Sequence, residues 1–242
     1  MVQRALTAAA LLVLAPLGHA DDIDLTQLLG VQGDFRQLSE DLGAALSYKP
    51  VAPAEPLGLL GIDIGLEITV TDLQGSNVYE RATGSSSNSD YLLVPKLHVH
   101  KGLPLRLNVD AFYSTVPDSN IELFGGAVGF ALIEGGVTLP ALTVRAAATK
   151  LSGVDGLDLD TQSIELTVSK GFALLTPYGG IGRVHVKSEP TGIAALGLRK
   201  ESFDLDKVYA GLNINLGLIN LAFEADQTGD AASYSAKFGF RF

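Results

Sequence analysis

Cysteine is absent from the 242 residues, and so is tryptophan. Without cysteine there is no disulfide framework, no thiol chemistry and no cysteine-ligated metal site, although an oxidising compartment stays compatible with the chain. Positive charge is also scarce, since 17 Lys and Arg residues stand against 27 Asp and Glu residues, for a formal net charge of −10. This balance argues against a nucleic-acid partner, because such binding depends on Lys and Arg neutralising phosphates.

Long apolar runs are missing as well, except near the start of the chain. Arg4 precedes an apolar run over residues 5–17, and Gly18 and Ala20 flank His19 before two acidic residues. This pattern is typical of a secretory signal peptide, and the run is too short for a membrane-spanning helix. We therefore expect residues 1–20 to be a signal peptide that is cleaved after Ala20, and the protein to be exported.

Hydrophobicity is instead spread along the chain, which has 47% hydrophobic residues and a mean hydropathy of +0.27. From Leu59 onward about ten segments alternate between apolar and polar residues. In residues 62–71, for example, the apolar side chains fall on one face and Asp63 and Glu67 on the other. A period of two indicates strands, and an apolar face on every strand favours a membrane barrel over a soluble sheet. The sequence predicts an all-β fold, a transmembrane antiparallel up-and-down β-barrel over residues 58–242.

The polar faces carry acids and bases in similar numbers. The charged residues expected inside are Asp63, Glu67, Asp110, Glu165, Glu224, Lys96, Arg106, Arg145, Arg183, Lys187, Lys237 and Arg241. Ten strands enclose little more space than side chains fill, and buried charges must be paired, so we expect a lumen largely filled by paired charges. In residues 178–187 the pattern predicts Val184 and Val186 outside and His185 inside. A three-residue turn at 102–104 would set Lys96 opposite Asp110.

Long and short connections alternate along the predicted strands, as they do in outer-membrane barrels. Residues 72–90, 151–160 and 188–202 give long polar connections, whereas those near Gly102 and Gly217 are tight. An even strand number puts both barrel ends on the periplasmic side. The side chains expected to replace tryptophan in the aromatic girdles are Tyr91, Phe112, Tyr113, Phe172, Tyr178, Phe203 and Tyr209.

Residues 21–57 have a different pattern from the rest of the chain. Apolar residues recur at spacings of three and four between Leu28 and Ala45, which predicts a short amphipathic helix with Asp34 as its N-cap. A proline-rich linker follows at residues 49–58. The helix is compatible with three positions: a plug in the lumen, a place against the periplasmic rim, or the membrane surface.

The chain ends with the strand pattern SYSAKFGFRF at residues 233–242. Together with the segments around 141–172 and 176–186, this ending resembles the bacterial outer-membrane β-barrel superfamily. The resemblance implies an outer-membrane location and recognition by the barrel assembly machinery through Tyr234, Phe238, Phe240 and Phe242. Eight or twelve strands remain alternatives to ten, and a soluble secreted β-sandwich is a third class of fold.

Few residues in this pattern point to chemistry. His98, His100 and Asp110 are candidates for a hydrolytic or metal site, but they adjoin a tight turn on the predicted periplasmic side. His185, with Ser188 and Glu189 nearby in sequence, is a second weak candidate. We therefore expect no catalytic residues, no cofactor, no metal and a non-enzymatic role in structure, surface interaction or limited passage of a small solute. The alternative is a lipid-modifying or proteolytic barrel enzyme that uses His and Asp.

Overall fold

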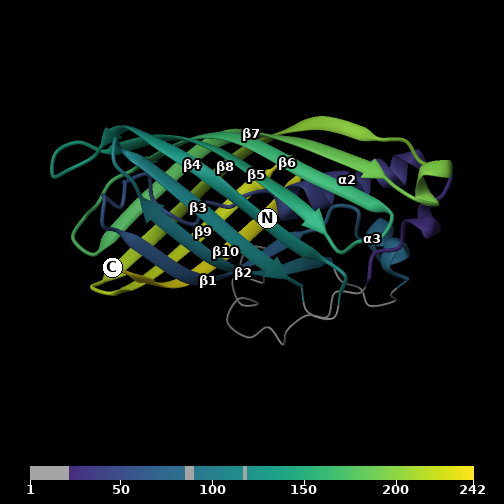
Figure 1. Ribbon diagram of the computed structural model, residues 1–242, viewed down its shortest axis with the longest axis horizontal. Coiled ribbons are helices and arrows are strands. Elements are labelled where there is room, and N and C mark those ends of the chain that lie inside the picture. The colour runs from purple at the N-terminus through teal and green to yellow at the C-terminus, as the bar shows by residue number, and fades with distance from the viewer. Residues whose placement is uncertain (1–21, 85–89, 117–118) are drawn as a thin grey trace.

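The computed structural model describes residues 22–84, 90–116 and 119–242, which form a closed antiparallel barrel (Figure 1). The ten strands are β1 Ile62–Asp72, β2 Tyr91–Gly102, β3 Leu107–Thr115, β4 Glu122–Glu134, β5 Ala141–Ser152, β6 Leu157–Ser169, β7 Leu175–Pro190, β8 Glu201–Leu216, β9 Ile219–Thr228 and β10 Ala231–Arg241. Each strand pairs with the next, and β10 closes on β1. The predicted fold class and strand number are confirmed, whereas the signal peptide and its cleavage site lie outside the described residues.

Helices occupy the connections and the part of the chain before β1. They are η1 Leu25–Leu28, α2 Gln32–Leu46, α3 Ser76–Thr83 and η2 Ala194–Leu196. The predicted N-terminal helix is therefore present as α2, but it begins two residues before Asp34, and its N-cap residue is Val31. Asp34 lies in the first turn, where its carboxylate is 2.5 Å from the guanidinium of Arg81 in α3. In the described part of the chain, no helix is long and apolar enough to cross a membrane.

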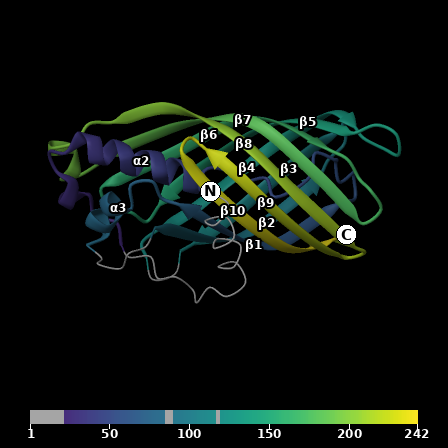
Figure 2. The same cartoon turned by 180° about the vertical axis from the view of Figure 1, so that it is seen from behind.

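The two ends of the barrel differ, and we call them the loop end and the turn end. The loop end carries the connections that follow β1, β3, β5, β7 and β9, with α3 and η2 (Figure 1). The turn end carries the connections 103–106, 135–140, 170–174 and 217–218, together with the C-terminus (Figure 2). The predicted long connection between β5 and β6 is wrong, since only residues 153–156 join these strands. There β6 extends into the expected loop, because Leu157 and Leu159 pack inside the barrel.

The outer wall carries an apolar belt through the middle of the barrel. Its exposed side chains include Ile64, Leu66, Leu97, Val99, Val128, Val144, Ile164, Leu166, Ile181, Val208, Phe223, Phe238 and Phe240. Those on β1, β2, β6, β8, β9 and β10 are positions that the alternation predicts to face outward. A continuous exposed apolar band of this kind is typical of a wall that faces lipid.

Toward the loop end the two faces of the wall exchange character. Val184 and Val186 of β7 are fully buried inside, whereas Arg183, His185 and Lys187 point outward. The predicted orientation of this segment is therefore wrong. The physical reason is that α2 offers an apolar surface inside the lumen here, while the outside of the wall has passed beyond the lipid belt and carries polar residues.

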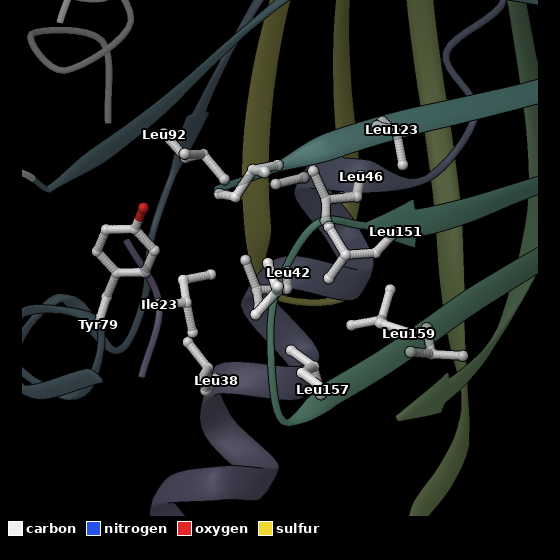
Figure 3. Close-up of a cluster of buried hydrophobic side chains, with 14 of the residues drawn as sticks. Ile23, Leu38, Leu42, Leu46, Tyr79, Leu92, Leu123, Leu151, Leu157 and Leu159 are labelled. Carbon is white, nitrogen blue, oxygen red and sulfur yellow. The ribbon is translucent and has the colours of Figure 1, made fainter. Parts of the chain in front are cut away.

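Helix α2 lies inside the loop end of the barrel and contacts β1, β2, β6, β7, β8 and β10. Its apolar face, including Leu38, Leu42 and Leu46, packs against Leu151 and Leu157 of the wall (Figure 3). At Gly43 the helix comes so close to β7 that an added Cβ would lie 2.7 Å from a methyl group of Val186. The lumen at the loop end thus holds a hydrophobic core like that of a soluble protein.

Most of the expected girdle aromatics face inward instead. Phe112, Tyr178, Phe203 and Tyr209 are buried in the lumen, whereas Tyr113 and Phe172 are exposed on the outside. Tyr178 covers Gly211 and Tyr209 covers Gly180, where an added Cβ would clash with the rings. For the four buried residues the girdle prediction is wrong. Glycines on neighbouring strands leave space that the rings of Phe112, Tyr178 and Tyr209 fill, whereas Phe203 packs against Arg36 of α2.

Candidate functional site

The segment that follows α2 crosses the lumen from the loop end toward β1 at the turn end. Pro50, Pro53 and Pro56 prevent a helix and keep it extended. Five hydrogen bonds join its backbone to side chains of the wall. The contacts run from Lys207 Nζ to Tyr48 O at 2.6 Å, Val51 N to Glu224 Oε2 at 3.1 Å, Ala54 N to Ser169 Oγ at 3.1 Å, Thr143 Oγ1 to Ala54 O at 2.6 Å and Leu57 N to Asn108 Oδ1 at 3.2 Å. The segment is therefore fixed to several strands along its length.

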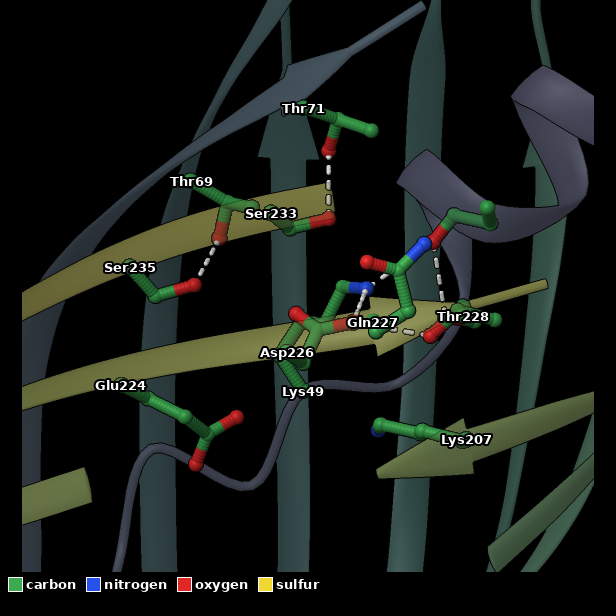
Figure 4. Close-up of polar contacts among 12 residues, drawn as sticks. Lys49, Thr69, Thr71, Lys207, Glu224, Asp226, Gln227, Thr228, Ser233 and Ser235 are labelled. Carbon is green, nitrogen blue, oxygen red and sulfur yellow. Dashed lines mark hydrogen bonds and ion pairs between the residues drawn. The ribbon is translucent and has the colours of Figure 1, made fainter. Parts of the chain in front are cut away.

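An ion pair joins this lumen segment to β9. Lys49 Nζ lies 2.8 Å from Asp226 Oδ1, and both side chains are almost completely buried. Thr228 donates a second hydrogen bond to the same carboxylate oxygen, and the hydroxyls of β1 and β10 pair nearby, as Thr69 with Ser235 (Figure 4). Neither Lys49 nor Asp226 is among the inward charges predicted from the strands.

The wall itself contributes further buried ion pairs. Lys96 is 2.7 Å from Glu67, Lys207 is 2.8 Å from Glu165, and Arg241 is 2.7 Å from Asp63. Three of the charges expected inside lie elsewhere. Arg106 lies in the turn after β2 and pairs with Glu134. Arg183 points outward and pairs with Asp206, and Lys187 also points outward. Lys207, which is not among the charges predicted to lie inside, is buried in the interior.

The predicted pairing of Lys96 with Asp110 is wrong. His100 stands opposite Asp110, and Asn108 stands opposite Gly102 rather than His98. The connection spans residues 103–106, and Leu105 and Arg106 adopt positive φ angles of 61° and 65°. Non-glycine residues rarely take this conformation, so the residue types at 103–106 do not indicate the longer turn.

His98, His100 and Asp110 do come together, inside the barrel toward the turn end. Each offers one atom that could bind a metal ion, and these atoms all lie within 4.8 Å of one another. Glu67 Oε2 accepts a hydrogen bond from His98 Nδ1 at 3.0 Å, and His100 pairs with Asp110. Among the described residues, His98 Nε2 and Asp110 Oδ2 have no hydrogen-bond partner. This donor set is of the type that binds zinc, but Lys96 Nζ already pairs with Glu67, and such positive charge opposes a further cation.

The surroundings of the histidine cluster are closed. The ring of Tyr48 lies edge-on to His98 at 5.9 Å, and a void of about 20 Å³ beside His100 and Asp110 is bordered by residues of the lumen segment. A void of that size holds about one water molecule. The cluster is therefore out of reach of a macromolecular or lipid substrate.

The second sequence candidate separates into parts. Ser188 points inward and bonds to Ser39 of α2 at 2.8 Å, and Glu189 pairs with Lys200. His185 faces outward, where its Nδ1 is 2.7 Å from Asp204 Oδ1 and its Nε2 is 3.3 Å from Ser202 Oγ. Residues next to each other on a strand point to opposite faces, so the partners of His185 come from β8 rather than from its own neighbourhood.

At the loop end, the helix is also tied to the connection after β1. Asp41 of α2 accepts hydrogen bonds from the backbone N–H groups of Gly75 at 2.8 Å and Gln74 at 3.1 Å. Burial raises the pKa of Asp41, and these two N–H groups offset part of that rise. The connection that contains α3 is thus fixed to the lumen helix.

A closed ten-stranded wall with an apolar outer belt and a polar, side-chain-filled interior defines a transmembrane β-barrel protein. No family model matches the chain, and no curated protein matches it. The solved structures that resemble it include bacterial outer-membrane proteins. The N-terminal barrel domain of OprF from Pseudomonas aeruginosa is 12% identical, with 76% of this chain and 99% of that chain covered and a TM-score of 0.37.

OprG from the same organism is 13% identical, with 79% of this chain and 99% of that chain covered and a TM-score of 0.38. Ail, the attachment invasion locus protein of Yersinia pestis, is 14% identical, with 75% and 97% covered and a TM-score of 0.29. At these identities and scores the likeness concerns the barrel fold alone.

Proposed function

We propose that this protein is a bacterial outer-membrane barrel whose lumen is closed by its own residues 32–57, so that it does not conduct solutes. The barrel would serve as a rigid scaffold that presents its loop end at the cell surface for a structural or interaction role. The supporting observation is the series of contacts that fixes residues 48–57 to the wall, with the buried ion pair of Lys49 and Asp226 among them.

The paired charges of the lumen support the same proposal. Glu67, Glu165 and Asp63 each have a cationic partner within 3 Å inside the wall, and the lumen segment covers the histidine cluster. We assign the interior no enzymatic role, since the ion pairs described above join its charged groups and the void beside the histidine cluster holds about one water molecule. Passage of a small solute would require the whole segment to move out of the lumen.

Conductance in planar lipid bilayers tests the proposal. The full-length protein is expected to show little or no current, and a variant without residues 22–57 is expected to show stepwise openings, because the deletion empties the space between the strands. Heat-modifiable gel mobility identifies the variant that has folded as a barrel. A second variant, with a protease site at Glu55 cut after folding, covers the case in which the deletion prevents assembly.

Two results would contradict a closed lumen. One is steady current from the intact protein, and the other is a folded deletion variant with a current no larger than that of the intact protein. A variant that lacks only part of the outer connection, residues 76–83, serves as the control. It removes α3 but leaves the lumen segment in place, so its current should equal that of the intact protein.

The outward face of β10 supports a further proposal on assembly. Tyr234, Phe238 and Phe240 alternate along the outer wall, and the chain ends at Phe242 beside Ile62. We propose that the barrel assembly machinery recognises this face. Replacement of Phe242 by Ser should reduce the amount of folded protein in the outer membrane without changing the fold of the fraction that assembles.

A further inference from the structure

We infer that Ser202, His185 and Asp204 form an esterase site on the outer wall, which hydrolyses an acyl ester of a lipid in the outer leaflet of the membrane. The inference departs from the non-enzymatic role expected from the sequence. It concerns the outer wall and not the lumen. The assignment to the outer leaflet rests on the proposed function, in which the loop end faces the cell surface.

The three side chains are connected in the order that nucleophilic catalysis requires. His185 and Asp204 are directly opposite each other on β7 and β8, and Ser202 is the next outward residue of β8. The carboxylate of Asp204 only accepts hydrogen bonds, so at 2.7 Å it places the ring proton on Nδ1 of the neutral imidazole. Nε2 is then free of a proton and can accept from the Ser202 hydroxyl at 3.3 Å. A nucleophile, its base and a group that orients the base are all present.

Position along the wall gives the site its substrate class. His185 is four residues beyond Ile181, the last apolar outward residue of β7, which is about 13 Å along the strand. The site therefore lies just beyond the lipid belt, at the level where the ester groups of membrane lipids meet water. A buried lumen site could not reach such a bond, whereas an outward site at this level can.

A groove on the same wall leads from the lipid belt to these residues. Its volume is about 880 Å³, and it is lined by Val128, Ala146, Ala148 and Ile164 as well as by His185 and Asp204. Small residues such as Ala146 and Ala148 line this part of the wall, and most of the lining is apolar, although Gln162 and the ion-paired Arg183 also line the groove. Ser202 lies one outward position beyond Asp204, which lines the groove. We place the hydrocarbon chain in the groove, with its ester group beyond Asp204 and beside the Ser202 hydroxyl. The apolar groove and the polar triad are separate observations that point to the same class of ligand.

The developing negative charge on the ester oxygen must be stabilised by side chains, because backbone N–H groups of β7 and β8 bond within the sheet. Two donors flank the site: Gln162 is opposite His185 on β6, and Lys187 is opposite Ser202 on β7. A second depression, of about 420 Å³, contains both residues and also Lys150. The ammonium groups of Lys150 and Lys187 also suit the phosphate of an anionic lipid headgroup.

The reaction consumes one water molecule. Ser202 Oγ bonds to the ester carbonyl carbon while its proton passes to His185 Nε2, and the alcohol then leaves with that proton. Water next adds to the acyl-serine, its proton passing through His185 back to Ser202 Oγ, and the carboxylic acid is released. The sum is one ester and one water giving one alcohol and one acid, with no redox change.

The test uses the full-length folded protein in detergent micelles with p-nitrophenyl butyrate and p-nitrophenyl palmitate. We expect Ser202→Ala and His185→Gln to lower the rate by about a thousandfold or more. Asp204 acts through His185 as a positioning residue. We therefore expect Asp204→Asn to lower kcat on the order of a thousandfold while KM stays the same. Asp206→Asn, which removes the neighbouring acid of the Arg183 ion pair, is the matched control and should keep the full rate.

Two further measurements separate this site from a surface ion pair. A fluorophosphonate probe should label the intact protein and not Ser202→Ala. Ala148→Phe, which fills the groove, should lower the rate with the palmitate ester far more than the rate with the butyrate ester. In vesicles, release of fatty acid from lipid A supports a lipid A ester as the substrate, whereas release only from phosphatidylglycerol assigns a phospholipid ester.

Absence of hydrolysis and of probe labelling in the folded protein would overturn the inference, as would full activity in Ser202→Ala. These measurements do not involve conductance, and the short ester needs no membrane. A failure of the esterase site is therefore distinguishable from a failure of the closed-lumen proposal.

Discussion

Replacing Lys49 by Met is expected to destabilise the folded barrel by about 3–5 kcal/mol. The substitution leaves Asp226, of which 1% of the side chain is exposed, without its cationic partner in the lumen. Thr228 still donates to the carboxylate, but a neutral hydrogen bond does not replace the ion pair. The midpoint of urea unfolding in phospholipid vesicles measures the change, and protease cleavage near residue 55 reports whether the lumen segment has been released.

Two controls define the cause of this effect. The double variant Lys49→Met with Asp226→Leu removes both charges, so it should recover most of the lost stability. Lys150→Met affects a pair 4.0 Å apart whose side chains are about half exposed, and it should cost about 1 kcal/mol or less. An unchanged midpoint in Lys49→Met would mean that the segment is not held by this pair.

Replacing Leu42 by Ala is expected to cost about 2–5 kcal/mol, because Leu42 is fully buried between the helix and the inner wall. The cavity would lie in the apolar core of Figure 3, beside Leu38 and Leu46 on the same helix face. Since α2 is a separate element inside a hydrogen-bonded wall, we expect the helix to loosen before the strands separate. Hydrogen exchange of the α2 amides should rise, while the heat-modifiable mobility of the barrel is kept.

The matched control for the core is Leu196→Ala. Leu196 lies in η2 at the loop end and is 87% exposed, so its truncation leaves no cavity and should change the stability by about 0.5 kcal/mol or less. If Leu42→Ala and Leu196→Ala unfold at the same urea concentration, the apolar contact between α2 and the wall does not contribute to stability.

The lipid belt is the part of the fold that local sequence predicts well. On β1 and β10, alternate residues such as Ile64, Leu66, Phe238 and Phe240 are apolar, and their outward direction follows from the strand period alone. The bilayer is the same for every strand, so no partner needs to be known. Short turns between these segments favour ten strands, with eight and twelve as the alternatives.

Register and the charged site were harder to predict. The position of Asp110 depends on a turn in which Leu105 and Arg106 take positive φ, and local composition does not signal that conformation. The sequence pattern places Lys49 in a proline-rich linker, and its ion-pair partner Asp226 is 177 residues away in the chain. Ser202 and His185 meet because β7 and β8 are neighbours, although the closest serine in the chain, Ser188, points to the other face.

The amino-acid sequence by itself determined a closed antiparallel wall with one face toward lipid, because alternation is a local property and lipid imposes the same demand on every strand. Only the tertiary structure decided what fills the barrel and which face of its loop end is apolar. There the environment inside the wall is set by α2 and residues 47–57, and both contact strands far away in the chain. The same apolar residue can therefore face lipid at one level and the helix at another.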